Sequence, residues 1–216
     1  MFCFGDQGGV DMDEFKGRWQ AQQSVDAGSR LVGGALARSV AECFMAGYQL
    51  ALDRTFHLQD TRWGALAVSE GFEAHPPVTV DGESALAGSK TWVPGAPYID
   101  TVMIRVGRGR DAMFVQIDLP CSGVTSALRE KDGFLDELDI GMIHLDRVPQ
   151  GSYRVIDAFP VRQFPLMEAT SFFAVLMTVA DQTGASVNSA LMDESHEMAH
   201  ISATELSVEH AKQFVR

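Results

Sequence analysis

Cysteine is scarce in this sequence of 216 residues, and its spacing is as informative as its number. Cys3, Cys43 and Cys121 lie far apart, and none of them forms a Cys-x-x-Cys pair. The pattern therefore indicates neither a disulfide framework nor a zinc site built from cysteines. It predicts a reduced, cytoplasmic setting.

Long apolar runs and an excess of positive charge are also lacking. The longest apolar stretch, FFAVLMTVA at 172–180, is about half of what a bilayer requires. The first residues, MFCFGDQGG, have neither the basic start nor the apolar run of a signal peptide. Lysine and arginine number 17 against 29 aspartates and glutamates, a net charge of -12. Such a chain repels phosphate backbones and anionic membranes on average, so we expect neither a nucleic-acid partner nor a membrane span.

The stretch HEMAH at 196–200 matches the His-Glu-x-x-His pattern of zinc hydrolases. In that pattern two histidines one helical turn apart bind zinc, and the glutamate acts as general base. The third ligand is not evident, because the two positions where one class carries its Gly and third His hold Ala203 and Leu206. Ten residues of helix rise about 15 Å, so His210 does not reach a metal held by His200. We expect a solvated helix here and predict no metal site, with a zinc hydrolase as the third hypothesis.

Hydrophobic periodicity divides the chain into three segments. Apolar residues at helical spacing run through 30–56 and return after 165, with a break near 181–186. In the first run one helical stripe is formed by Leu36, Val40, Phe44 and Tyr48. We therefore predict a helical segment at 1–61, a β module at 62–158 and a second helical segment at 159–216.

Short runs with a period of two fill the middle segment, separated by Gly, Pro and Asp turns. The seven runs are WGALAVSE, PVTVDG, ESALAGSKTWV, DTVMIRVG, DAMFVQIDL, GVTSALRE and IGMIHLDRV. Runs of this length and spacing are typical of an antiparallel barrel or sandwich.

Four stretches of the β module occur in an order that is found in a known family. They are GALAVSEG (64–71), VDGESALAGSKTWVPGAPYIDTVMI (80–104), LPCSGVT (119–125) and IHLDRVP (143–149). Together they resemble the middle domain of the acyl-CoA dehydrogenase family. The resemblance implies an α+β chain: an antiparallel β-barrel domain flanked by N-terminal helices and a truncated C-terminal helical bundle.

The same resemblance implies FAD as cofactor and places three residues beside it. Ser69 matches the hydroxyl residue that hydrogen-bonds the pyrimidine edge of the flavin, and Val68 matches the neighbour whose backbone lines that edge. Trp92 matches the aromatic residue that packs on the isoalloxazine, a suitable role for a large planar π-face. From spacing alone, an ordinary core tryptophan is the favoured interpretation of Trp92. For Ser69 the alternative is a hydroxyl that bonds local backbone at a strand end.

The sequence also departs from the family pattern. Pro94 stands where the family has a threonine that addresses flavin N5, and proline supplies neither a hydroxyl nor an N–H. The late segments that hold a neighbouring subunit's pyrophosphate and supply the usual base have no counterpart. Glu168 matches the region where some members place the catalytic base. Its alternative role is a carboxylate favoured by the dipole near a helix start.

Three arginines, Arg105, Arg108 and Arg110, fall on the hairpin sequence RVGRGR. Arginine grips phosphate bidentately, so a phosphate clamp is one interpretation. A solvated turn on an acidic protein is the other.

Function follows from the resemblance in two forms. The first is a flavin-dependent oxidoreductase acting on the CH–CH group of acyl-CoA thioesters. It would be a homo-oligomer, with an electron-transfer flavoprotein or a second chain that completes the fold as further partner. The second is a non-catalytic relative that retains the β module for acyl-CoA binding or assembly.

Overall fold

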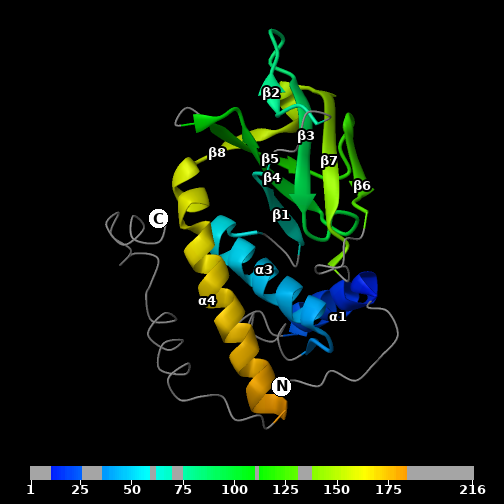
Figure 1. Ribbon diagram of the computed structural model, residues 1–216, viewed down its shortest axis with the longest axis vertical. Helices are drawn as coiled ribbons and strands as arrows, with labels where there is room; N and C mark the ends of the chain where they lie inside the picture. Colours follow the sequence, from blue (N-terminus) through cyan, green and yellow to red (C-terminus); the bar gives the residue numbers. More distant parts are fainter. Residues whose placement is uncertain are drawn as a thin grey trace. The chain divides into compact units, whose positions relative to one another are not determined.

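Helices come first and last along the chain, with strands between them (Figure 1). The structure is a computed structural model that describes residues 11–25, 36–58, 62–69, 75–109, 112–130 and 138–183. The helices are α1 (Met12–Val25), α3 (Val40–Phe56), the 3₁₀ helix η3 (Gln150–Ser152) and α4 (Ala158–Thr183). The strands are β1 (Gly64–Ala67), β2 (Thr79–Val80), β3 (Leu86–Val93), β4 (Thr101–Val106), β5 (Met113–Asp118), β6 (Val124–Leu128), β7 (Gly141–Val148) and β8 (Arg154–Ile156).

These elements belong to two compact units. The helical unit contains α3, α4 and the part of α1 from Gly17 onward. The β unit contains β1 to β8, together with Lys16 and the residues just before it. Two helical segments that lie far apart in the sequence therefore share one unit.

The β unit consists of two four-stranded sheets (Figure 1). The first sheet has the order β1-β4-β5-β8, and the second has the order β2-β3-β7-β6. In the first sheet β4 and β5 form an antiparallel pair that runs from Thr101 opposite Asp118 to Val106 opposite Met113. β1 pairs with β4 in parallel, with Gly64 opposite Thr101.

The observed architecture confirms the α+β class and the positions of the seven β runs. It differs from the expected antiparallel barrel in two respects. The β1–β4 pair is parallel, and within the described residues the strands are joined into two sheets, not into one closed ring. The period of a strand shows which residues share a face but carries no information about the direction of its partner.

The core of the β unit is built mainly from β-branched side chains on the first sheet. Alternate residues of β4 and β5 are completely buried: Val102, Ile104, Val115 and Ile117. Burying one such side chain contributes about 1.5–3 kcal/mol to folding. Met103, on the other face of β4, is also completely buried. β4 is therefore buried on both faces from Val102 to Ile104, where three apolar residues follow one another in the sequence.

β3 contains a backbone conformation that requires glycine. Gly88 has φ +130°, a region that residues with a side chain rarely adopt. A Cβ atom at Gly88 would lie 2.4 Å from the carbonyl oxygen of Pro77. The next residue, Ser89, donates its N–H to the carbonyl of Pro76 at 2.8 Å. The segment before β2 therefore crosses directly against β3, and only a residue without a side chain permits this.

Local signals in the sequence define both ends of α3. The hydroxyl of Ser39 accepts the N–H of Glu42 at 3.1 Å and caps the first turn. At the other end His57 adopts a left-handed conformation and donates its N–H to Asp53 at 2.8 Å. Of the predicted apolar stripe, Tyr48 is buried, Leu36 and Phe44 are half-buried, and Val40 is 56% exposed.

α3 and α4 pack closely against each other (Figure 1). Phe172 of α4 lies against Gly47, where a Cβ would come within 2.4 Å of its ring. The ring of Phe164 makes an edge contact with Tyr48, with the centroids 5.7 Å apart. Gly47 therefore allows the two helices to approach, and the aromatic rings fill the space on either side.

α4 begins earlier than the sequence predicts, because FPVRQFP is helical. Pro160 lies in the first turn, where a missing N–H costs nothing, and Pro165 is accommodated inside the helix. By length and composition alone, Ala158–Ala180 would suffice to cross a bilayer, a test that core helices also pass. Within that window 39% is buried, and aromatic contacts join α4 to α3.

Candidate functional site

One edge of the β unit brings together the three residues predicted to contact a cofactor. The carbonyl of Ser69, just beyond β1, accepts the N–H of Thr91 at 3.3 Å. Thr91 precedes Trp92 on β3, so this bond holds Ser69 and its neighbour Val68 beside Trp92. Ser69 is exposed, whereas Val68 and Trp92 are half-buried. We call Val68, Ser69, Thr91, Trp92 and Arg129 the Trp92 edge.

An irregularity in β3 makes this edge possible. β3 pairs with β7 up to Lys90 opposite Ile143 and again at Val93 opposite Gly141. Between these positions the register shifts, and Thr91 and Trp92 have no paired residue on β7. The N–H of Thr91 is therefore available to reach Ser69, which follows a strand of the other sheet. Bulges of this kind commonly redirect side chains next to functional sites.

Arg129 belongs to the Trp92 edge although no sequence motif indicated it. Its guanidinium carbon lies 5.3 Å from the centroid of the Trp92 ring, a cation–π distance. The N–H of Arg129 bonds the carbonyl of Ile140 at 2.9 Å and fixes the backbone just beyond β6. Sequence reasoning singled out Arg105, Arg108 and Arg110 instead, because they are clustered. Trp92, the partner of Arg129, is distant in the sequence. The two residues come together only through the pairing of β6 with β7 and of β7 with β3.

The segment after Trp92 turns away sharply. Pro94 is buried and begins the turn. The N–H of Gly95 bonds Leu138 at 3.3 Å, and the N–H of Tyr98 bonds Gly95 at 2.8 Å. The backbone hydrogen bonds of this segment stabilise the turn, and Pro94 has no N–H that could bind a ligand.

Glu168 lies on α4 and belongs to the helical unit, not to the β unit that contains the Trp92 edge. It is half-buried, and burial raises the pKa of its carboxyl above the ordinary value. It follows Pro165 by nearly one turn and lies well inside the helix, not at its first turn. The helix-dipole role considered from the sequence therefore does not apply.

The other candidates from the sequence, the HEMAH stretch and the three hairpin arginines, form no metal or phosphate site among the described residues. The HEMAH stretch and Arg110 lie outside the described residues. Arg105 is half-buried on β4, and Arg108 is exposed in the turn that follows. In the described part of the chain there is no group of three or more His, Cys, Asp or Glu side chains that would hold a metal ion.

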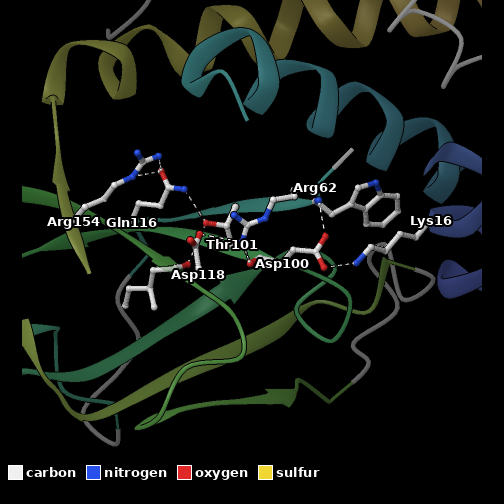
Figure 2. A network of polar contacts seen from close by, with 9 residues as sticks. Lys16, Arg62, Asp100, Thr101, Gln116, Asp118 and Arg154 are labelled. Atoms are coloured by element: carbon white, nitrogen blue, oxygen red, sulfur yellow. Dashed lines mark hydrogen bonds and ion pairs between the residues drawn. The ribbon is translucent and has the colours of Figure 1, made fainter. Parts of the chain in front are cut away.

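A second polar cluster lies at the opposite end of β1 (Figure 2). Lys16 donates to a carboxylate oxygen of Asp100 at 2.7 Å and to the carbonyl of Tyr98 at 2.6 Å. The other carboxylate oxygen of Asp100 accepts the N–H of Trp63 at 2.9 Å. Arg62 donates to the carbonyl of Asp100 at 2.7 Å. The turn containing Asp100 therefore ties the start of β1 to the first turn of α1.

The cluster continues across the first sheet (Figure 2). Arg62 forms an ion pair with Asp118 at 3.0 Å. Burial would raise the pKa of Asp118. The hydrogen bond and charge of Arg62, together with hydrogen bonds from Thr101 and Gln116, hold that pKa below its ordinary value. The side-chain amide of Gln116 donates to Thr101 at 3.1 Å, and its oxygen accepts Arg154 at 2.6 Å.

The second cluster serves the fold. Each of its charged groups has a protein partner, and its bonds link the beginning of β1 and β4 to the end of β5 and to β8. It is roughly 15–20 Å from the Trp92 edge, the length of the five or six residues between Trp63 and Ser69 in extended conformation. The Trp92 edge, with its exposed hydroxyl and partly exposed indole, is the better candidate for ligand contact.

Comparison with solved structures defines the fold of the chain. It is similar to butyryl-CoA dehydrogenase from Megasphaera elsdenii, with a TM-score of 0.60, 12% identity, and coverage of 89% of this chain and 68% of that one. It is also similar to the FAD complex of PigA, with a TM-score of 0.57, 12% identity, and coverage of 80% and 58%. For the acyl-CoA dehydrogenase from Bacillus anthracis complexed with FAD, the TM-score is 0.56 at 12% identity, with coverage of 79% and 37%.

The chain therefore has the fold of the acyl-CoA dehydrogenase-like flavoproteins, and the resemblance inferred from four sequence stretches is confirmed at the level of the fold. It spans about half the length of several of these proteins, including 46% of the prolyl acyl carrier protein oxidase AnaB. No family model and no curated protein sequence matches the chain.

Proposed function

We propose that the chain binds FAD at the Trp92 edge and acts as a flavin-dependent oxidoreductase of the acyl-CoA dehydrogenase type. The observation that carries the proposal is the bond between Ser69 and Thr91. It assembles Val68, Ser69 and Trp92 from two sheets, in a fold whose solved neighbours include complexes with FAD. In this proposal the two sheets correspond to the middle β-barrel domain of that family.

The chemistry of the Trp92 edge suits a flavin. The exposed hydroxyl of Ser69 is able to donate and accept hydrogen bonds at the polar edge of a heterocycle. The partly exposed indole of Trp92 offers a flat π-face for an aromatic ring system. Bound FAD would supply the electron acceptor. The contribution of the chain is to bind and orient it, with Val68 lining the same edge.

The substrate in this proposal is an acyl-CoA thioester, and Glu168 is the base that takes its α-proton. A general base works best when its pKa lies near the working pH. Burial moves the pKa of Glu168 in that direction. Assembly as a homo-oligomer and electron transfer to a separate flavoprotein belong to the same proposal.

Flavin titration of the purified protein tests the cofactor. We expect the wild type to retain FAD, seen as visible flavin absorbance that remains with the protein on gel filtration. Trp92→Ala removes the stacking face and is expected to raise the dissociation constant about 10- to 100-fold. Trp92→Phe preserves an aromatic face and serves as the matched control, with a smaller loss. Wild-type protein that binds no FAD would end the proposal.

Activity of Glu168→Gln tests the base. With acyl-CoA and an artificial electron acceptor, we expect turnover to fall about 10²- to 10⁴-fold while FAD affinity is unchanged. In the wild type the rate should decline as the pH falls through the raised pKa, because the base must be unprotonated. Desolvation disfavours the charged carboxylate, so the glutamine variant should unfold at the same temperature as the wild type or higher. Equal turnover of the two proteins would remove Glu168 from the mechanism.

Pro94 favours a second candidate, a relative that binds acyl-CoA or assists assembly without catalysis. The turn at Pro94 presents neither an N–H nor a hydroxyl at the position that resembles the N5 contact of the family. Acyl-CoA binding by calorimetry, together with absence of turnover in a preparation saturated with FAD, would select this candidate over the first.

A further inference from the structure

We propose that Arg129 is a positioning residue of the Trp92 edge, which fixes the indole of Trp92 as a platform for the isoalloxazine ring of FAD. The inference rests on the proposed function and adds to it a residue that no sequence motif indicated. It starts from the guanidinium of Arg129, which lies over the ring of Trp92 at 5.3 Å from its centroid.

The backbone on both sides of this contact is held in place. The N–H of Arg129 bonds Ile140, so the residue continues the pairing of β6 with β7. On the other side, the N–H of Thr91 bonds Ser69 and anchors the residue before Trp92. Two anchored backbones present a guanidinium and an indole to each other, and the contact limits the rotation of both side chains.

The indole of Trp92 needs such a restraint. Thr91 and Trp92 lie where the register between β3 and β7 shifts, so no opposite residue on β7 packs against them in register. Trp92 is also only partly buried, and a tryptophan that is not fully enclosed has more than one rotamer available. Since an indole has two faces, Arg129 on one of them leaves the other for an aromatic ligand. Holding the ring in one orientation before binding reduces the entropy lost on binding.

Charge gives Arg129 a second effect at this place. The chain carries a net charge of -12, which opposes the approach of an anionic dinucleotide. A guanidinium stays protonated at every working pH and stacks on aromatic rings better than an ammonium group does. Arg129 therefore places a positive charge at the edge proposed to bind FAD.

FAD titration of matched variants tests the role of Arg129. Arg129→Met preserves side-chain length without charge and is expected to raise the FAD dissociation constant about three- to tenfold. Arg129→Lys preserves charge but stacks less well, and its loss should be smaller. Arg147→Met is the control. Arg147 lies exposed on β7 of the same sheet, and its substitution removes one positive charge, as Arg129→Met does. It should bind FAD as the wild type does.

A double-mutant cycle shows whether Arg129 acts through Trp92. In a Trp92→Leu background, Arg129→Met should have a clearly smaller effect on FAD affinity, because only the contribution of its charge remains to be lost. An equal effect in both backgrounds would overturn the positioning role, and so would unchanged affinity of Arg129→Met in the wild-type background. Both results leave the proposed function standing. Wild-type protein that binds no FAD would instead overturn the proposed function and this inference with it.

Near-UV circular dichroism of the protein without added flavin provides a readout independent of the cofactor. The tryptophan signal of Arg129→Met should be weaker than that of the wild type, because the indole of Trp92 gains rotational freedom. Arg147→Met should preserve the wild-type signal. Identical spectra for wild type and Arg129→Met would contradict the restraint on Trp92.

Discussion

Gly88→Ala is expected to lower the free energy of unfolding by about 3–5 kcal/mol, from backbone strain and steric overlap together. Gly88 has φ +130°. A Cβ there would lie 2.4 Å from the carbonyl oxygen of Pro77 and 2.7 Å from Cα of Val78. Both neighbours are backbone atoms, which do not rotate away as a flexible side chain does. For a domain with a total stability of about 5–15 kcal/mol, this loss removes from roughly a fifth of the stability to all of it.

Urea denaturation followed by circular dichroism measures the effect of Gly88→Ala. Gly82→Ala is the matched control, since a Cβ at Gly82 would meet no atom within 4 Å. This exposed substitution should change stability by less than about 0.5 kcal/mol. If the two variants have the same denaturation midpoint, the close crossing of the Pro77 segment over β3 is wrong.

Asp100→Ala is expected to cost about 2–4 kcal/mol, the range for breaking a partly buried ion pair and leaving a buried N–H unsatisfied. The carboxylate of Asp100 accepts Lys16 on one oxygen and the N–H of Trp63 on the other. Trp63 is completely buried, and the Lys16 side chain is only 14% exposed. Asp100→Asn still offers an acceptor to Trp63 and should cost about half as much.

An exposed ion pair of the same unit provides the control for Asp100. Glu83 pairs with Arg147, and their side chains are 77% and 63% exposed. Removing an exposed pair changes stability by about 0–1 kcal/mol. The melting temperature of Asp100→Ala should therefore be lower than that of Asp100→Asn, and that of Glu83→Ala should be close to the wild-type value. Equal melting temperatures for Asp100→Ala and Glu83→Ala would show that the partly buried contacts of Asp100 stabilise the fold no more than the exposed ion pair does.

The strands of the β unit were largely predictable because their signal is local. Each of the seven runs identified by period two contains one observed strand, from Gly64 in β1 to Val148 in β7. β8 was missed because a strand of three residues, Arg154–Ile156, is too short to show a period. The parallel pairing of β1 with β4 could not be predicted either, because the direction of pairing depends on how the strands of the whole unit are connected.

The helices show where local signals mislead. Apolar residues return to helical spacing only after residue 165, yet α4 begins at Ala158 and includes Pro160 and Pro165. The apolar residues at the start of α1 are buried, but they are few and lie in a polar sequence. There the contacts with the rest of the fold outweigh the local signal.

The Trp92 edge was predicted in part. The family-like motifs identified Val68, Ser69 and Trp92, and the bond between Ser69 and Thr91 places them together. Their role beside a cofactor stays a prediction, which the titrations address. Arg129 could not be predicted, because its proximity to Trp92 depends on a register shift between two strands. A register shift is a property of paired backbones and leaves little trace in either strand alone.

The bond between Lys16 and Asp100 sets an order of events during folding. Its two residues are 84 positions apart in the sequence. Closing so long a loop costs entropy that is repaid only when the turn before β4 already exists. A chain grows from its N-terminus, so Lys16 emerges long before its partner is synthesised. The first turn of α1 therefore docks late, although it is made before the strands of the β unit.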